Sequence, residues 1–98
     1  MAEVTIVFWR DIPAQVIVGR GRRGTKLPLP ERFEQAIDRA AMKSGAAESD
    51  EYMAGFRKAD PYSAAGSDSE AAEAAVAQID AAYDQDRIKT LIANHGWA

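Results

Sequence analysis

A basic, glycine-rich stretch is the segment of this chain whose residue types are best suited to chemistry. Residues 19–26 read GRGRRGTK and combine three glycines with four positive charges, directly after an apolar run at residues 16–18. Backbone N–H groups exposed by glycine, together with cationic side chains, can hold a phosphate or a partner's carboxylates. We therefore expect anion or partner binding by these cations and one more at the end of the first strand: Arg10, Arg20, Arg22, Arg23 and Lys26.

The same stretch also matches a dinucleotide-binding string, with glycines at positions 19, 21 and 24 after a strand. That chemistry needs a helix to begin at the loop, because the pyrophosphate binds the helix N-terminus. Pro28 and Pro30 delay the next helix and no β-α-β unit follows, which argues against a dinucleotide site. Two interpretations stay open: an anion-holding loop, and a hairpin turn in which glycine supplies positive φ and the arginines are solvated.

Two tryptophans offer large contact surfaces. Trp9 is either a core side chain, as large aromatic residues usually are, or a contact for a partner. Trp97 lies next to the last residue, and a frayed tail rarely holds a tryptophan. We expect Trp97 to dock the tail on the second face of the sheet or on another chain, and both tryptophans are candidate partner contacts.

Catalytic and metal-binding groups are sparse. His95 is the only histidine and there is no cysteine, so a zinc site would depend on carboxylates, which is uncommon. The carboxylate pairs Glu34 with Asp38 and Asp80 with Asp84 each share a helix face, where solvated surface is the usual role and cation binding the alternative. We expect no catalytic residue, cofactor or metal, and an isolated chain that is not an enzyme.

The first thirty residues predict a small antiparallel sheet. Residues 4–10 are β-branched and aromatic, residues 11–13 contain a proline and form a turn, and residues 14–19 return as a second strand. The short link requires antiparallel pairing, and residues 25–29 add an edge strand, where proline is tolerated. Alternation makes both faces of the first strand apolar, so both need a covering layer.

Helices are predicted after the sheet. Residues 30–44 have an apolar stripe at helical spacing and end before Gly45, a typical residue just past a helix end. A shorter helix over residues 49–58 and a loop over residues 62–67 follow. The inward side chains of that shorter helix are expected to be Tyr52, Met53 and Phe56.

The last helical segment begins with a capping box formed by Ser67 and Glu70. Its apolar stripe slips after Tyr83, which predicts a break at residues 84–86. The expected fold class is α+β, in a single domain with a β-rich part at residues 1–29 and a helical part at residues 30–98. A small N-terminal antiparallel β-hairpin or three-stranded meander packs against two to four C-terminal helices. The first two helices should cover one face of the sheet, and the last helix or another protein should cover the other.

Charge is divided unevenly along the chain. The net charge of the 98 residues is −3, yet residues 1–45 have eight Lys or Arg against five Asp or Glu, whereas residues 46–98 have four against ten. This polarity can orient a partner at short range, and the overall acidity argues against general nucleic-acid binding. The absence of cysteine, of an export signal and of a long apolar run favours a cytoplasmic protein without membrane association.

Residues 8–16 (FWRDIPAQV) and 29–38 (LPERFEQAID), with the basic stretch between them, resemble a family of short bacterial proteins labelled virulence factor. The resemblance covers most of residues 3–60. A similar domain is attached to a larger helical-repeat protein described as a conserved virulence factor. The resemblance implies an accessory role in folate- or corrinoid-linked one-carbon metabolism, and it supplies no catalytic residues.

The expected function is a non-catalytic interaction or accessory protein that binds a protein partner or a second copy of itself. The alternative is a binding module for a phosphorylated or polyanionic small molecule, held by the basic loop at residues 19–26.

Overall fold

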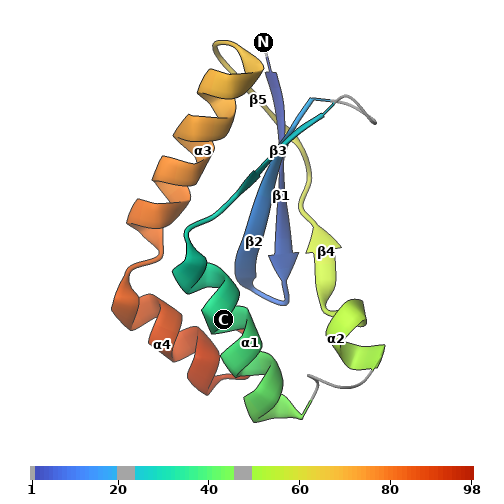
Figure 1. The fold of residues 1–98 in the computed structure, drawn as a ribbon, viewed down its shortest axis with the longest axis vertical. Helices are drawn as coiled ribbons and strands as arrows, with labels where there is room; N and C mark the ends of the chain where they lie inside the picture. The colour runs from blue at the N-terminus through green and yellow to red at the C-terminus, as the bar shows by residue number, and fades with distance from the viewer. Residues whose placement is uncertain (1, 20–23, 46–49) are drawn as a thin grey trace.

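The computed structural model describes residues 2–19, 24–45 and 50–98 and confirms the α+β class, with an antiparallel sheet followed by helices. The sheet has the order β3-β2-β1-β4, and β5 pairs with β1 as well. In chain order the elements are β1 (Ala2–Trp9), β2 (Ile12–Val18), β3 (Thr25–Pro28), α1 (Glu31–Ser44), α2 (Asp50–Ala54), β4 (Phe56–Lys58), β5 (Tyr62–Ala64), α3 (Asp68–Ala82) and α4 (Gln85–Ala93) (Figure 1).

Strand β1 is central because a second segment pairs along its other edge. Trp9 pairs with Phe56 in β4, and Ala2 pairs with Ala64 in β5, while the Ala59 N–H donates to the Ile6 carbonyl at 3.0 Å between them. The prediction of a helix through residue 58 and a loop over residues 62–67 was therefore wrong. Backbone groups of β1 would otherwise lie unpaired along this edge, and strand pairing satisfies them.

The shorter helix expected over residues 49–58 is in fact the single turn α2. Tyr52 is half-buried against the core, but Met53 is 70% exposed and Phe56 is 37% exposed. The predicted inward orientation was therefore wrong for Met53, which is exposed on α2, and for Phe56, because the helix ends at Ala54 and Phe56 pairs with β1 as part of β4.

The β1–β2 hairpin turns at Arg10 and Asp11, one residue earlier than predicted, so Ile12 and Pro13 already belong to β2. Arg10 has a φ of 55°, an uncommon conformation for a residue with a side chain. The register shifts between Val7 and Phe8, which marks an irregularity in the pairing.

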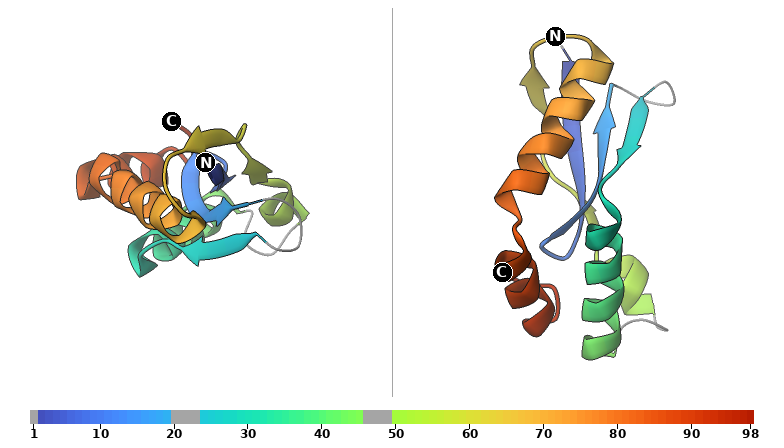
Figure 2. Two further views of the ribbon diagram at one scale, coloured as in Figure 1. Left: turned by 90° about the horizontal axis from the view of Figure 1, so that it is seen from above. Right: turned by 60° about the vertical axis from the view of Figure 1, so that its left-hand side comes forward.

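All three long helices lie on one side of the sheet. Helix α3 contacts β1, β2 and β3, α1 contacts β2, and α4 packs on α1 (Figure 2). Of the two expected covers for the second face, the last helix was wrong, because α3 shares the face that α1 covers, and another protein stays a prediction. Apolar side chains from both helices and from β2 therefore form one cluster.

Helix α1 confirms its predicted stripe and end. Gly45 adopts the left-handed conformation at φ 79°, and its N–H donates to the Ala41 and Met42 carbonyls. Glycine is favoured there because a Cβ is costly in this conformation. The buried side chains of the helix are those predicted: Phe33, Ala36, Ile37, Ala40 and Ala41.

The break between α3 and α4 is also confirmed. Ser67 and Glu70 form the predicted capping box of α3, and the Asp84 carboxylate caps α4 by accepting the Arg87 N–H at 2.8 Å. Arg32 of α1 holds the break in place: its guanidinium donates to the Tyr83 carbonyl at 2.6 Å and to the Asp80 carboxylate at 2.7 Å. One side chain thus joins α1 to the end of α3 and to Tyr83, in the connection that precedes α4.

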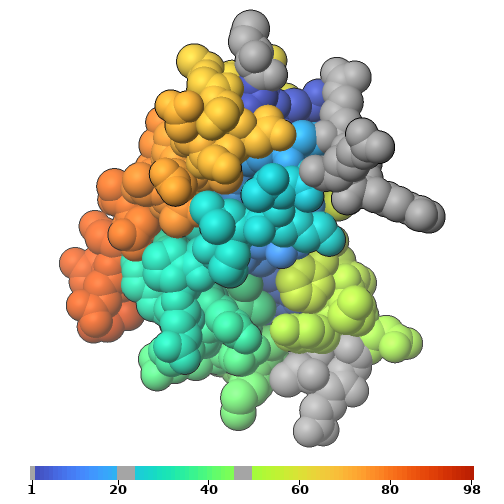
Figure 3. Space-filling view, turned by 45° about the horizontal axis from the view of Figure 1, so that its top comes forward, coloured from blue at the N-terminus to red at the C-terminus, as the bar shows by residue number. Residues whose placement is uncertain are grey.

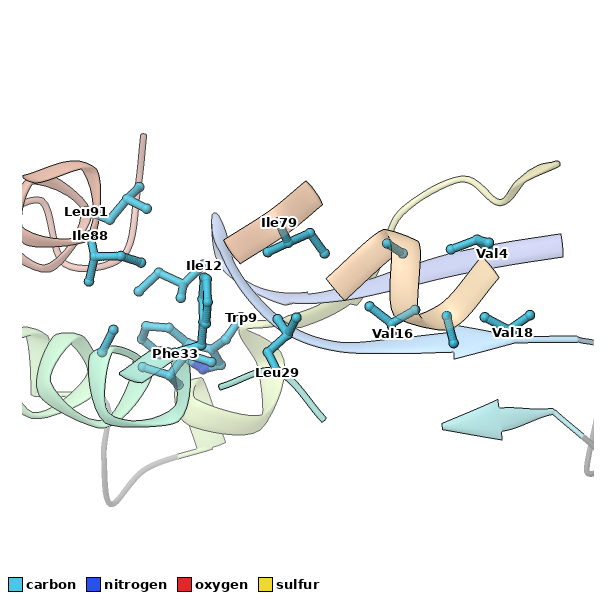
Figure 4. Packing of buried hydrophobic residues seen from close by; sticks show 14 of the residues in the cluster. Val4, Trp9, Ile12, Val16, Val18, Leu29, Phe33, Ile79, Ile88 and Leu91 are labelled. Carbon is cyan, nitrogen blue, oxygen red and sulfur yellow. The ribbon is translucent and has the colours of Figure 1, made fainter. Parts of the chain in front are cut away.

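The core runs from the strands to the α1–α4 pair (Figure 4). Trp9 and Phe33 are the largest fully buried side chains. Across the three described ranges no polar or charged residue is buried, so the interior depends on apolar packing. None of the described helices is long and apolar enough to cross a bilayer.

Candidate functional site

The predicted site residues fall into two separate places. Arg20, Arg22 and Arg23 lie outside the described residues. Lys26 is an exposed residue of β3, beside the glycines at the two ends of the basic loop, whereas Arg10 lies in the β1–β2 turn at the opposite end of the sheet (Figure 1). Arg10 and Lys26 therefore do not lie together, because the length of β1 separates them.

The ends of the glycine-rich loop are held close together. The Gly19 N–H donates to the Glu3 carbonyl at 2.9 Å, and Gly19 has a φ of 99°. A Cβ on Gly19 would lie 3.3 Å from the Gly24 Cα atom, so glycine suits both the conformation and the close approach. After Gly24 the chain continues as a strand, β3, and the helix that a dinucleotide site requires is not there.

The face of the sheet opposite the long helices is a shallow, open depression of about 860 Å³. Val7 and Ile17 give it an apolar part, next to polar side chains of the same two strands, Phe56 also lines it, and two lysines, Lys26 and Lys58, line it from β3 and β4. The remaining lining residues are Glu3, Thr5, Gln15, Gly19 and Gly24. We call this surface the outer sheet face. Its combination of apolar side chains and two cations suits recognition of an acidic surface.

Arg10 has a structural role at the other end of the sheet. Its guanidinium donates to the His95 carbonyl at 2.6 Å and lies between two indole rings, 4.7 Å from the Trp9 centroid and 5.3 Å from that of Trp97. These cation–π contacts attach the C-terminal segment to the hairpin turn.

The neighbouring aspartate completes this attachment. The Asp11 carboxylate accepts the Ala98 N–H at 2.8 Å and pairs with Arg57 at 3.0 Å. The tail therefore docks on the hairpin turn and not on the second sheet face, which was one of the two places expected, and contact of Trp97 with another chain stays a prediction.

The two tryptophans have different environments. Trp9 is fully buried, and its indole N–H donates to the Tyr52 carbonyl at 2.8 Å. Of its two predicted roles it therefore has that of a core residue, because none of its surface is accessible to a partner. Trp97 is 51% exposed, so one side of its ring is open to contact. Gly55 and Gly96 lie so close to the Trp9 indole that a Cβ would come within 2.6 Å and 2.8 Å of it.

A second, smaller pocket lies where β3 and α1 meet the α2–β4 segment, with a volume of about 230 Å³. The carboxylates of Glu34 and Asp38 line it, together with the rings of Tyr52 and Phe56. Burial, and after it the charges of Asp38 and Glu34, raise the pKa of the Tyr52 hydroxyl. The carboxylate pair was visible in the sequence, but its aromatic neighbours were not, because the β4 pairing that places them is non-local.

The other titratable residues considered in the sequence analysis make contacts that hold the fold together, within the part of the chain that the structure describes. Asp80 is paired with Arg32, Asp84 caps α4, and His95 contributes its backbone carbonyl to Arg10. Among residues 2–19, 24–45 and 50–98 no cluster of three His, Cys, Asp or Glu side chains could hold a metal ion.

Comparison with known proteins gives one relationship. Neither the curated proteins nor the solved structures contain a match to this chain. A family model described as "Virulence factor" matches residues 7–92, which include most of the outer sheet face, the α1 stripe and the α3–α4 break. Of the outer sheet face, Glu3 and Thr5 lie before the matched residues. The match extends beyond the two N-terminal segments that suggested the resemblance, and the chain belongs to the Virulence factor family.

Proposed function

We propose that this chain is a non-catalytic interaction protein that binds an acidic partner protein on its outer sheet face. The observation that supports this most directly is the absence of helical cover over the strands on that side, among the residues that the structure describes (Figure 2). Apolar side chains of central strands normally need a second layer. A partner protein would supply it.

Charge supports an acidic partner. Lys26 and Lys58 line the face from strands β3 and β4, on opposite sides of Val7 and Ile17, and Glu3 is the one acidic residue among its described lining residues. The four-residue segment between Gly19 and Gly24 adds three arginines to the same part of the sequence. Cations around an apolar centre increase the association rate and select for partners of opposite charge.

The partner class to test first comes from the family resemblance. Proteins of folate- or corrinoid-linked one-carbon metabolism are the proposed partners, in which case this chain is an accessory subunit.

A matched pair of charge reversals tests the surface. Lys26→Glu with Lys58→Glu changes the outer sheet face, whereas Lys43→Glu with Lys89→Glu makes the same charge change on exposed positions of α1 and α4. A partner should be captured from source cells by the wild type and the helix-side control, and lost by the sheet-face variant. The complex must then re-form from purified components. Equal capture by both variants would exclude the outer sheet face.

A polyanionic small molecule is the second candidate, because the same lysines and the glycine-rich loop could hold phosphates or carboxylates. Calorimetry with tripolyphosphate and with folate distinguishes it from a protein partner. Binding should weaken in Lys26→Ala/Lys58→Ala and in Arg22→Ala/Arg23→Ala. If wild type takes up neither anion, this candidate is excluded and the protein-partner proposal is unaffected.

A further inference from the structure

The small pocket beside the outer sheet face has the opposite electrostatic character. Figure 3 shows the surface where β3 and the start of α1 adjoin the α2–β4 segment. The apolar wall of the pocket includes Pro28, Leu29 and Ile37. No Lys or Arg is among the described residues that line it, and two carboxylates are.

Its aromatic wall is rigidly supported. The Tyr52 carbonyl accepts the buried Trp9 indole N–H, and the Tyr52 ring packs on Trp9 with 5.9 Å between centroids. Phe56 meets Tyr52 edge to face, at 5.5 Å and 83°. Gly55 permits this arrangement, because a side chain there would collide with Trp9. The rings are therefore positioned before any ligand arrives, which reduces the entropic cost of binding.

The carboxylate wall comes from one helix. Glu34 and Asp38 are four residues apart on α1, both are exposed, and neither forms a salt bridge within the described residues. Like charges at this spacing destabilise a helix. The raised pKa of the nearby Tyr52 hydroxyl reflects the same negative field, in addition to burial.

We propose that this pocket binds an alkylammonium group. Aromatic rings attract ammonium cations through the ring quadrupole, adjacent carboxylates add charge complementarity, and the apolar wall accommodates methyl or methylene groups. The volume of about 230 Å³ corresponds to roughly seven or eight water-sized groups, enough for a trimethylammonium head with a short chain or for the end of a lysine side chain.

The proposal is independent of the proposed function, because the ligand has the opposite charge and the carboxylates lie outside the outer sheet face. The two sources of an alkylammonium group are a free amine and a lysine of a partner. Choline serves as probe for the first and Nα-acetyl-lysine amide for the second.

Amide-resolved NMR titration of the full chain provides the test. Choline or the lysine probe should shift signals of α1, α2 and β4, and 3,3-dimethyl-1-butanol, the uncharged analogue of choline, should shift them far less. Glu34→Gln/Asp38→Asn should weaken binding at least about threefold, as expected for loss of exposed charge pairs. Tyr52→Leu should weaken it by a similar factor through loss of the ring face.

Glu31→Gln is the control, since it removes a carboxylate from the same helix without touching the pocket. Choline binding alone identifies a free amine, and binding of the lysine probe identifies a partner's side chain. The proposal is overturned if neither cation binds, if the neutral analogue binds equally well, or if Glu31→Gln weakens binding as much as the double variant.

Discussion

The two faces of this sheet differ although the same strands form both. On the inner face Val4, Val16 and Val18 are fully buried beneath the long helices. On the outer sheet face Thr5 and Ile17 are only half-buried, and Lys26 is exposed. Because side chains alternate along a strand, one face can specify the fold while the other stays available for binding. Substitutions should therefore divide into those that change stability and those that change recognition.

The largest expected effect is at the end of the inner face. Trp9→Ala removes the largest fully buried side chain and the shorter of the two hydrogen bonds that the Tyr52 carbonyl accepts. We expect the free energy of unfolding to fall by about 3–5 kcal/mol, measured by urea denaturation. A loss below about 1 kcal/mol would show that the tryptophan is not part of the core.

A glycine substitution tests the same packing from the other side. Gly55→Ala places a Cβ 2.6 Å from the Trp9 indole nitrogen, and overpacking of this kind costs about 1–3 kcal/mol. Trp9→Phe should relieve part of that cost in the double variant, because it removes the nitrogen-bearing ring. Additive losses in the double-mutant cycle would count against a direct collision.

Helix caps should have an intermediate effect. Ser67→Ala and Asp84→Ala each remove a side chain that accepts a backbone N–H at a helix start. Each should lower the free energy of unfolding by about 1 kcal/mol, and the same denaturation experiment measures it. Asp86→Ala, two residues after Asp84 and without a capping bond, is the matched control and should change stability less.

The pH dependence should be modest and confined to alkaline solution. The pKa of Tyr52 is raised in the folded chain above its unfolded value of about 10. The folded state then holds the proton more tightly, so stability is unaffected below that pH and decreases as the pH rises past it. Tyr52→Phe should make the decrease shallower. An identical pH profile for both proteins would show that Tyr52 is not responsible.

The smallest effect on stability, and the largest on binding, is expected on the outer sheet face. Lys26→Glu with Lys58→Glu should change the free energy of unfolding by no more than about 0.5 kcal/mol, yet abolish partner capture. A large loss of stability would remove the distinction between the two faces, because the lysines would then be structural.

Local signals explain which elements the sequence predicted well. Helix α1, its end at Gly45 and the break at Asp84 depend on spacing and capping within a few residues of each other. The basic loop was also recognised as the end of a hairpin, since β2 and β3 pair across it. The strands β4 and β5 were missed because each has three residues, too few for a periodic pattern.

The sequence by itself determined the class of the fold, the main helical boundaries and the family. Only the tertiary structure decided that α3 joins α1 on one face, that Trp9 is enclosed by Gly55 and Gly96, and that Arg10 holds the C-terminal segment. The physical reason is the separation along the chain of the residues that make each contact. Helices and turns follow from neighbouring residues, whereas cover, edge pairing and the acidic pocket depend on contacts between segments far apart in the chain.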